Sequence, residues 1–153
     1  MPKSDEPKIK RWIPFLAKTV KKVDKDTYFV GHSIGCQTIL RYIQQAKGKV
    51  GGVVFVGGWF TLSPAVTNSK EEYAIAKPWL KTPIDCKKVK KTTKRFVAVF
   101  SNNDPYVPMK NVAMFKKRLG AKIIVEKKKG HFSGEDGVKK LPAVLKGLLK
   151  MML

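Results

Sequence analysis

A serine flanked by two nearby glycines is the first candidate catalytic residue in this sequence. Residues 31–35 are Gly-His-Ser-Ile-Gly, the G-x-S-x-G pattern of a nucleophile elbow, and they stand between an apolar and an amphipathic segment. In a tight strand-to-helix turn, Ser33 presents its hydroxyl at the end of the sheet and the Ile34 N–H points into the same space. We predict that Ser33 attacks a carbonyl carbon and that Ile34 stabilises the oxyanion. A glycine–serine turn without chemistry is the alternative.

A serine hydroxyl needs a base to become a good nucleophile, and the chain has two histidines. His32 lies inside the turn itself, where we expect it to pack or form a local hydrogen bond. His131 follows an apolar segment at 122–126. The carboxyl ends of parallel strands meet at one edge of a sheet, so His131 is the candidate base. A loop histidine beside a glycine is the plainer interpretation.

An acid that orients the histidine should follow the strand between these two segments. Asp104 does so, because it comes after the apolar segment 96–100. The order Ser33, Asp104, His131 is that of α/β-hydrolases. Asp104 before a proline is also a common turn-capping residue, which is the alternative. Two rival acids, Glu135 and Asp136, follow His131 and suit this order less well.

The elements that must position these residues alternate between short apolar runs and amphipathic stretches. Such alternation predicts a parallel sheet with right-handed crossovers and helices on both faces, in a single domain over 1–153. The predicted strands are 27–30, 50–56, 96–100 and 122–126, and the predicted helices are 7–23, 34–46, 108–119 and 141–152, with Pro142 starting the last. Between them we expect a short helix at 71–77, breaks at Pro78 and Pro83, and a lysine-rich segment to Lys94.

Basic residues outnumber acidic ones by 32 to 11 over 153 residues, giving a formal net charge of +21. Such a field attracts polyanions without a designed site. Only four of the basic residues are arginines, and few aromatics interleave with the lysines, so the pattern is not typical of a sequence-specific reader of nucleic acid. A solvated lysine surface is the simpler interpretation.

The remaining composition narrows the class of protein. Cys36 and Cys86 lack metal-ligand spacing, and we expect Cys36 to be a small buried residue, so no metal and no cofactor is predicted. The longest nearly apolar run, 50–62, is too short for a membrane-spanning helix, which needs about 20 residues. The first residues show no apolar secretory signal, which favours a cytoplasmic protein. Trp59 and Phe60 follow a strand at the predicted catalytic edge, as walls of a substrate pocket or as core residues.

Four segments together resemble the retinoblastoma-binding protein nine-like serine hydrolases, an α/β-hydrolase family. They are the stretches 31–36, 57–60, 101–108 and 130–132, and the resemblance runs from about Asp5 to the C-terminus. It implies a compact α/β-hydrolase fold with Ser33, Asp104 and His131 as the triad. It also implies small ester or amide-type substrates.

The family begins with a further strand, loop and helix for which we find no counterpart here. An N-terminally shortened fold is therefore expected, with Ile34 as the sole visible oxyanion donor and with weak activity. The strand at Tyr28–Val30 would then lie at the edge of the sheet, where two copies of the chain can pair.

The sequence thus predicts a serine hydrolase of small carboxylic esters or amides that works through an acyl-enzyme intermediate. Two alternatives stay open at this point. One is a non-catalytic, hydrolase-like protein that binds nucleic acid or another polyanion through its lysine-rich surface. The other is an inert fragment of a hydrolase.

Overall fold

Four parallel strands form the centre of the structure, a computed structural model that describes residues 1–153. Their order in the sheet, β1-β2-β3-β4, is also their order in the chain. The strands are β1 (Tyr28–His32), β2 (Gly52–Val56), β3 (Phe96–Ser101) and β4 (Lys122–Glu126). Every residue of β2 and β3 is buried, as expected for strands covered on both faces. The predicted α/β class with a parallel sheet is confirmed.

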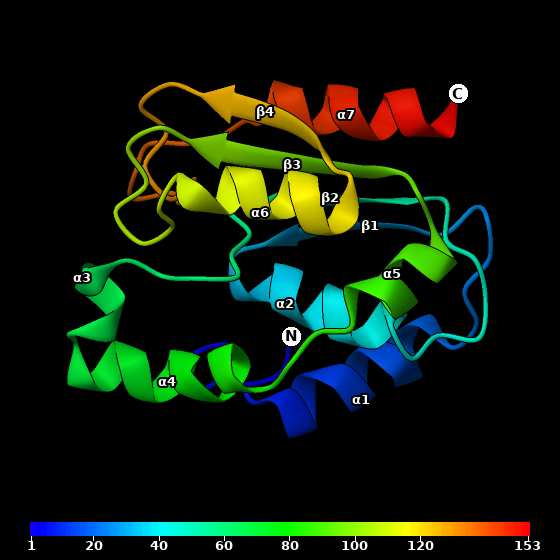
Figure 1. The fold of residues 1–153 in the computed structure, drawn as a ribbon, viewed down its shortest axis with the longest axis horizontal. Coiled ribbons are helices and arrows are strands. Elements are labelled where there is room, and N and C mark those ends of the chain that lie inside the picture. Colours follow the sequence, from blue (N-terminus) through cyan, green and yellow to red (C-terminus); the bar gives the residue numbers. More distant parts are fainter.

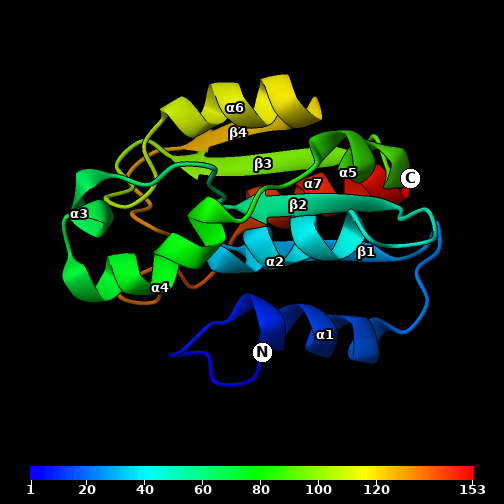
Figure 2. The same cartoon turned by 60° about the horizontal axis from the view of Figure 1, so that its bottom comes forward.

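Seven helices surround the sheet in unequal numbers on its two faces (Figures 1 and 2). Helices α2, α5 and α6 cover one face, α1 packs outside α2, and α7 alone lies on the other face. The helices are α1 (Ile9–Val20), α2 (Ile34–Ile43), α3 (Pro64–Thr67), α4 (Lys70–Lys81), α5 (Cys86–Thr92), α6 (Lys110–Leu119) and α7 (Pro142–Met152). Pro142 is at the first turn of α7, which confirms its predicted place.

The core is divided by the sheet because successive strand residues point to opposite faces. Val53 and Phe55 of β2 belong to the larger cluster, with side chains from α2, α5 and α6. Val54 and Val56 belong to the smaller cluster, with Val144 and Met151 of α7 among its members. All seven helices are shorter than a membrane span requires, and none has a sufficiently apolar stretch.

One prediction for the region between β2 and β3 is wrong. Helix α4 does not end before Pro78 but continues through it to Lys81. Proline removes one helical hydrogen bond there. The buried Trp79, whose carbonyl accepts a hydrogen bond from Arg41 Nη2, holds this last turn in place.

The lysine-rich segment contains a helix that was not predicted, α5. Asp85 caps this helix, since its Oδ1 accepts hydrogen bonds from the N–H groups of Lys87 and Lys88 at 3.0 Å each. Val89 is fully buried and anchors the helix to the core. A single apolar residue among lysines gives no period from which a helix is easily predicted.

The first eight residues form an N-terminal segment that is tied to the helices by two tryptophans. Trp12 Nε1 donates to the carbonyl of Pro2 at 2.9 Å, and Trp79 Nε1 donates to the carbonyl of Pro7 at 3.0 Å. The two indole rings also touch each other, edge to face, with centroids 6.0 Å apart. The segment is therefore fixed against α1 and α4.

Strand β1 lies at one edge of the sheet, paired only with β2. Val30 on this strand is 50% exposed. The edge position predicted for Tyr28–Val30 is thus observed. Pairing of two copies along this edge stays a prediction, which the mass of the protein in solution will test.

Candidate active site

Ser33 occupies a strained turn between β1 and α2. Its φ of 52° and ψ of −120° lie in a region that non-glycine residues rarely adopt. Two backbone hydrogen bonds hold it there: the Ser33 N–H donates to Val56 O at 2.9 Å, and the Cys36 N–H donates to Ser33 O at 3.0 Å. The turn is anchored to the neighbouring strand β2, so the direction of the Ser33 hydroxyl is fixed by the sheet.

The two glycines of the turn serve different purposes. A Cβ atom at Gly31 would lie 2.6 Å from Cδ1 of Ile39 and 3.1 Å from the backbone nitrogen of Cys36. A side chain at residue 31 would therefore force Ile39 to move and would crowd the backbone of α2. A Cβ atom at Gly35 would meet nothing within 4 Å. Space alone explains Gly31 and does not explain Gly35.

A chain of hydrogen bonds joins the three predicted catalytic side chains. His131 Nε2 lies 2.8 Å from Ser33 Oγ, and His131 Nδ1 lies 2.8 Å from Asp104 Oδ2. The side chain of Asp104 is 2% exposed and that of His131 is 13% exposed. A carboxylate only accepts hydrogen bonds, so Nδ1 carries the proton and Nε2 is free to accept the proton of the serine.

Both interpretations of Asp104 turn out to describe the same carboxylate. Its Oδ2 accepts the His131 Nδ1–H, while its Oδ1 accepts the N–H groups of Tyr106 at 2.9 Å and Val107 at 3.0 Å. One oxygen caps the turn that the following proline starts, and the other meets the imidazole. The turn therefore aims the acid at the histidine.

The backbone of His131 is held on both sides by side chains. Its N–H donates to Asp136 Oδ2 at 2.9 Å, and its carbonyl oxygen lies 2.6 Å from His32 Nε2, which must donate. His32 was expected to interact locally; instead it reaches a residue that is 99 positions away. Partial burial holds the pKa of His32 below its ordinary value, which keeps this ring neutral beside His131.

Asp136 is exposed, yet one of its oxygens organises the loop after β4. Besides the His131 N–H, Oδ2 accepts the Ser133 N–H at 3.0 Å and the Ser133 hydroxyl at 2.7 Å. These bonds, with the Ser133 hydroxyl first, lower the pKa of Asp136. Gly130 makes room for the carboxylate, because a Cβ atom there would lie 2.0 Å from Asp136 Oδ1 at a positive φ of 51°.

Asp136 appeared in the sequence only as a rival to Asp104. Its role in holding the loop was missed because its partners are backbone groups and a serine, which no catalytic motif includes. The sequence signal that was available is the spacing of Ser133 and Asp136, which is typical of a side-chain-capped turn.

A cavity of about 370 Å³ opens beside Ser33. Ser33, Ile34 and His131 line it, and Trp59 and Tyr106 form further walls. Ile34 is the first residue of α2, so its N–H has no partner within the helix and is free for an oxyanion. The predicted position of Trp59 at the pocket agrees with this lining, although the residue is also part of the core.

Phe60 packs in the core, which is one of the two places that the sequence allows for it. Phe60 is not among the residues that line the cavity. Its ring packs against Phe115 with centroids 4.7 Å apart, beneath the guanidinium of Arg118. Its N–H donates to Asn111 Oδ1 at 2.7 Å. The turn after β2 therefore directs Phe60 toward α6.

The cysteines and other ligand-type side chains form no second centre. Cys36 is fully buried, its thiol donates to Gly31 O at 3.1 Å, and burial raises its pKa to about 12. A thiol with that pKa is not a nucleophile at neutral pH. No group of three or more histidine, cysteine or acidic side chains is arranged to hold a metal ion.

The chain is similar in sequence to two known hydrolases. The YdeN putative hydrolase of Bacillus subtilis is 25% identical over 146 residues, covering 94% of this chain and 73% of YdeN. The serine hydrolase RBBP9 of Rattus norvegicus is 26% identical over 125 residues, covering 82% of this chain and 62% of RBBP9. The chain thus spans only part of the length of both relatives.

Solved structures show the same fold. The crystal structure of the ydeN gene product from B. subtilis superimposes with a TM-score of 0.88 at 23% identity, over 99% of this chain and 79% of that one. A YdeN-like hydrolase from Pectobacterium atrosepticum gives a TM-score of 0.67 at 18% identity, over 95% of this chain and 70% of that one. The family described as serine hydrolase matches residues 1–150, so the chain belongs to the serine hydrolase family.

Proposed function

We propose that this chain hydrolyses small carboxylic esters or amides with Ser33 as nucleophile, His131 as base and Asp104 as the orienting acid. The observation that carries the proposal is the hydrogen-bond chain from Asp104 through His131 to Ser33, with both links at 2.8 Å. Family membership supports hydrolase chemistry in general. The cavity beside Ser33 supplies space for a small acyl group.

The first half of the reaction makes an acyl-enzyme. Ser33 Oγ bonds to the substrate carbonyl carbon while its proton moves to His131 Nε2. The carbonyl π electrons move to the oxygen, which the Ile34 N–H stabilises. When the carbonyl re-forms, the bond to the leaving alcohol or amine breaks, and the leaving group takes the proton from His131.

The second half repeats these steps with water. Water attacks the acyl carbon, gives a proton to His131 Nε2 and expels Ser33, whose Oγ recovers that proton. Asp104 is nearly fully enclosed, and its carboxylate offsets the positive charge that His131 carries in each half-reaction.

Labelling with a fluorophosphonate probe tests the proposal. The wild-type protein should be labelled and Ser33→Ala should not. Ser4→Ala is the matched control, because Ser4 lines the same cavity but forms no hydrogen bond with His131. Equal labelling of wild type and Ser33→Ala would refute the assignment.

Polyanion binding is a second candidate, and the ion pairs favour it. Of 32 lysines and arginines, only Lys8 and Arg11 pair with a carboxylate, and both use Glu6. No other lysine or arginine forms an ion pair with a carboxylate. We expect binding to duplex DNA that ignores sequence and weakens steeply with salt, by about 10³-fold or more between 50 and 200 mM if six or more phosphates are contacted. Sequence preference at about 150 mM salt would instead indicate a dedicated nucleic-acid site.

A further inference from the structure

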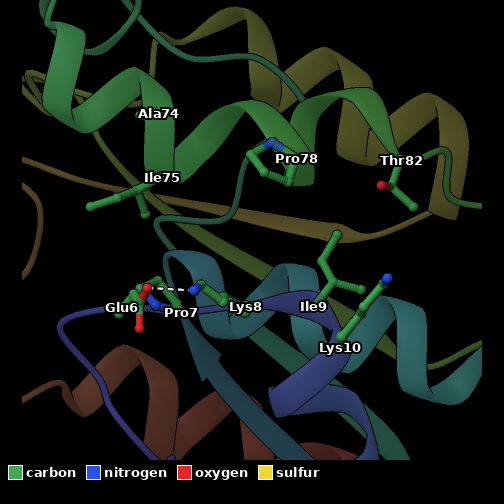
Figure 3. A pocket seen from close by; sticks show the side chains of 9 residues that line it. All are labelled: Glu6, Pro7, Lys8, Ile9, Lys10, Ala74, Ile75, Pro78 and Thr82. Carbon is green, nitrogen blue, oxygen red and sulfur yellow. Dashed lines mark ion pairs between the residues drawn. The ribbon is translucent and has the colours of Figure 1, made fainter.

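A second hollow adjoins the catalytic cavity and shares two wall residues with it. This groove lies between the N-terminal segment and α4 and has a volume of about 690 Å³ (Figure 3). Pro7 and Ile75 line both the groove and the cavity that contains Ser33. The two hollows therefore lie side by side, with Pro7 and Ile75 as shared walls.

The walls of the groove are suited to hydrocarbon. Ile75 and Pro78 on α4 lie opposite Pro7 and Ile9 of the other wall (Figure 3). The two prolines have no backbone N–H to offer a ligand. Glu6 and Lys8 are paired with each other at 2.5 Å, which leaves Lys10 and Thr82 as the other polar residues of the lining.

A hydrogen bond holds together the two walls that the hollows share. The carbonyl of Pro7 accepts the Trp79 Nε1–H at 3.0 Å, and Trp79 is 1% exposed. Ile75 is one turn before Trp79 on the same helix, so this hydrogen bond ties the Pro7 wall to the α4 wall of the groove. A ligand would find this groove already formed, which lowers the ordering cost of binding.

We propose that the groove binds the apolar arm of an ester whose carbonyl lies at Ser33, so that the favoured substrates are esters with medium-length alkyl chains. This rests on the proposed function. A substrate arm is the occupant because the groove adjoins the catalytic cavity, with Pro7 and Ile75 as shared walls. The arm belongs either to the acyl group or to the alcohol, and two substrate series separate these sources.

The first experiment measures kcat/KM along both series. One is p-nitrophenyl acetate, butyrate, hexanoate and octanoate; the other is ethyl, butyl, hexyl and octyl acetate. Burial of each added methylene should raise kcat/KM by about fourfold until the groove is filled. A rise in the first series assigns the acyl arm, and a rise in the second assigns the alcohol arm. Flat values in both series overturn the proposal.

The second experiment obstructs the groove at a residue outside the catalytic cavity. Ala74 lines only the groove and is exposed, so Ala74→Trp should fill the space without disturbing the core. We expect the ratio of octanoate to acetate kcat/KM to fall at least tenfold. Ala74→Asp, which adds charge rather than bulk, should lower the same ratio. Lys77→Trp is the control, because it adds the same ring to an exposed position of α4 outside the groove.

These outcomes separate the groove from the catalytic assignment. Fluorophosphonate labelling of Ser33 with an unchanged chain-length ratio in Ala74→Trp and Ala74→Asp overturns the groove and leaves the catalytic residues standing. No labelling and no ester hydrolysis overturn both. A lowered ratio in Lys77→Trp equal to that in Ala74→Trp also counts against the groove, since it would show a general effect on α4.

Discussion

The two sides of Ser33 are built in opposite ways. On the His131 side, side chains occupy both backbone polar groups of the histidine, and both of its ring nitrogens have partners. On the groove side, the walls are mainly apolar, and the carboxylate of Glu6 is occupied by lysine and arginine. Polar groups fix direction and apolar surfaces fix only shape. The first side should therefore control kcat, and the second should control which substrate arm binds.

Ser33→Ala tests the polar side with the largest expected effect. Loss of the nucleophile should lower kcat on p-nitrophenyl acetate by about 10⁴-fold or more. Steady-state turnover of purified protein measures this, with Ser69→Ala, which lies at the start of α4 and outside the cavity, as the control that should retain activity. A variant with more than a tenth of wild-type turnover would mean that another group performs the reaction.

Asp104→Asn should have the next largest effect, a fall in kcat of roughly 10³-fold to 10⁴-fold, because an amide favours the wrong histidine tautomer. The amide oxygen can still accept the N–H groups of Tyr106 and Val107, so the midpoint of thermal unfolding should change little. If activity falls only in proportion to a loss of folded protein, Asp104 acts as a turn cap and not as the partner of His131.

Asp136→Ala tests the hold on the backbone of His131. Its removal frees the His131 N–H and should lower kcat by about 10-fold to 100-fold through misplacement of the imidazole. Asp136→Asn should recover part of the loss, because an amide oxygen still accepts these hydrogen bonds. Glu135→Gln, an exposed neighbour, is the control. Equal kcat in the wild type and all three variants would show that the loop keeps its conformation without the Asp136 carboxylate.

The stability that Asp136 contributes should depend on pH in a defined direction. Its hydrogen bonds lower the pKa below the ordinary 3.8, so the folded state favours the ionised form. The difference in unfolding free energy between wild type and Asp136→Ala should be fully present above pH 3.8 and shrink as the pH falls through the lowered pKa. Urea unfolding from pH 7 to pH 3 measures it, and a difference that grows on acidification would contradict this.

Ile75→Ala has the smallest expected effect and tests the apolar side. Removing most of the Ile75 side chain should lower kcat/KM on p-nitrophenyl octanoate by about fivefold. The change should be mainly in KM, since the lost contact is apolar. Steady-state kinetics on octanoate measure both constants. A change confined to kcat would contradict the division between the two sides, because it would link Ile75 to the chemical step.

The predictable part of this molecule follows from local patterns. Continuous apolar runs indicate all four strands. Because the carboxyl ends of parallel strands lie at one edge of a sheet, the sequence also predicts that Ser33, Asp104 and His131 meet there, although they are 71 and 27 residues apart. Their catalytic roles stay a prediction until the variants are measured. Gly31 was recognised from its motif, and its steric purpose is visible only in the contact with Ile39.

The unpredicted part depends on contacts between distant segments. The groove forms because Trp79 binds the carbonyl of Pro7, a pair 72 residues apart that no periodicity reveals. The sequence leaves Phe60 open between the pocket and the core, because its contact with Phe115 is visible only in the structure. Helix α4 passes Pro78 because burial of Trp79 outweighs one missing hydrogen bond.

The route of the N-terminal segment matters for how the protein is handled at the bench. Ser4 and Asp5 line the cavity that holds Ser33, whereas the C-terminal helix ends near Tyr28 and Arg95, where the strands begin. An affinity tag fused ahead of Met1 would lie near the catalytic cavity and compete with test compounds for access to it. Purification handles and fluorophores belong after Leu153, at the far end of the sheet.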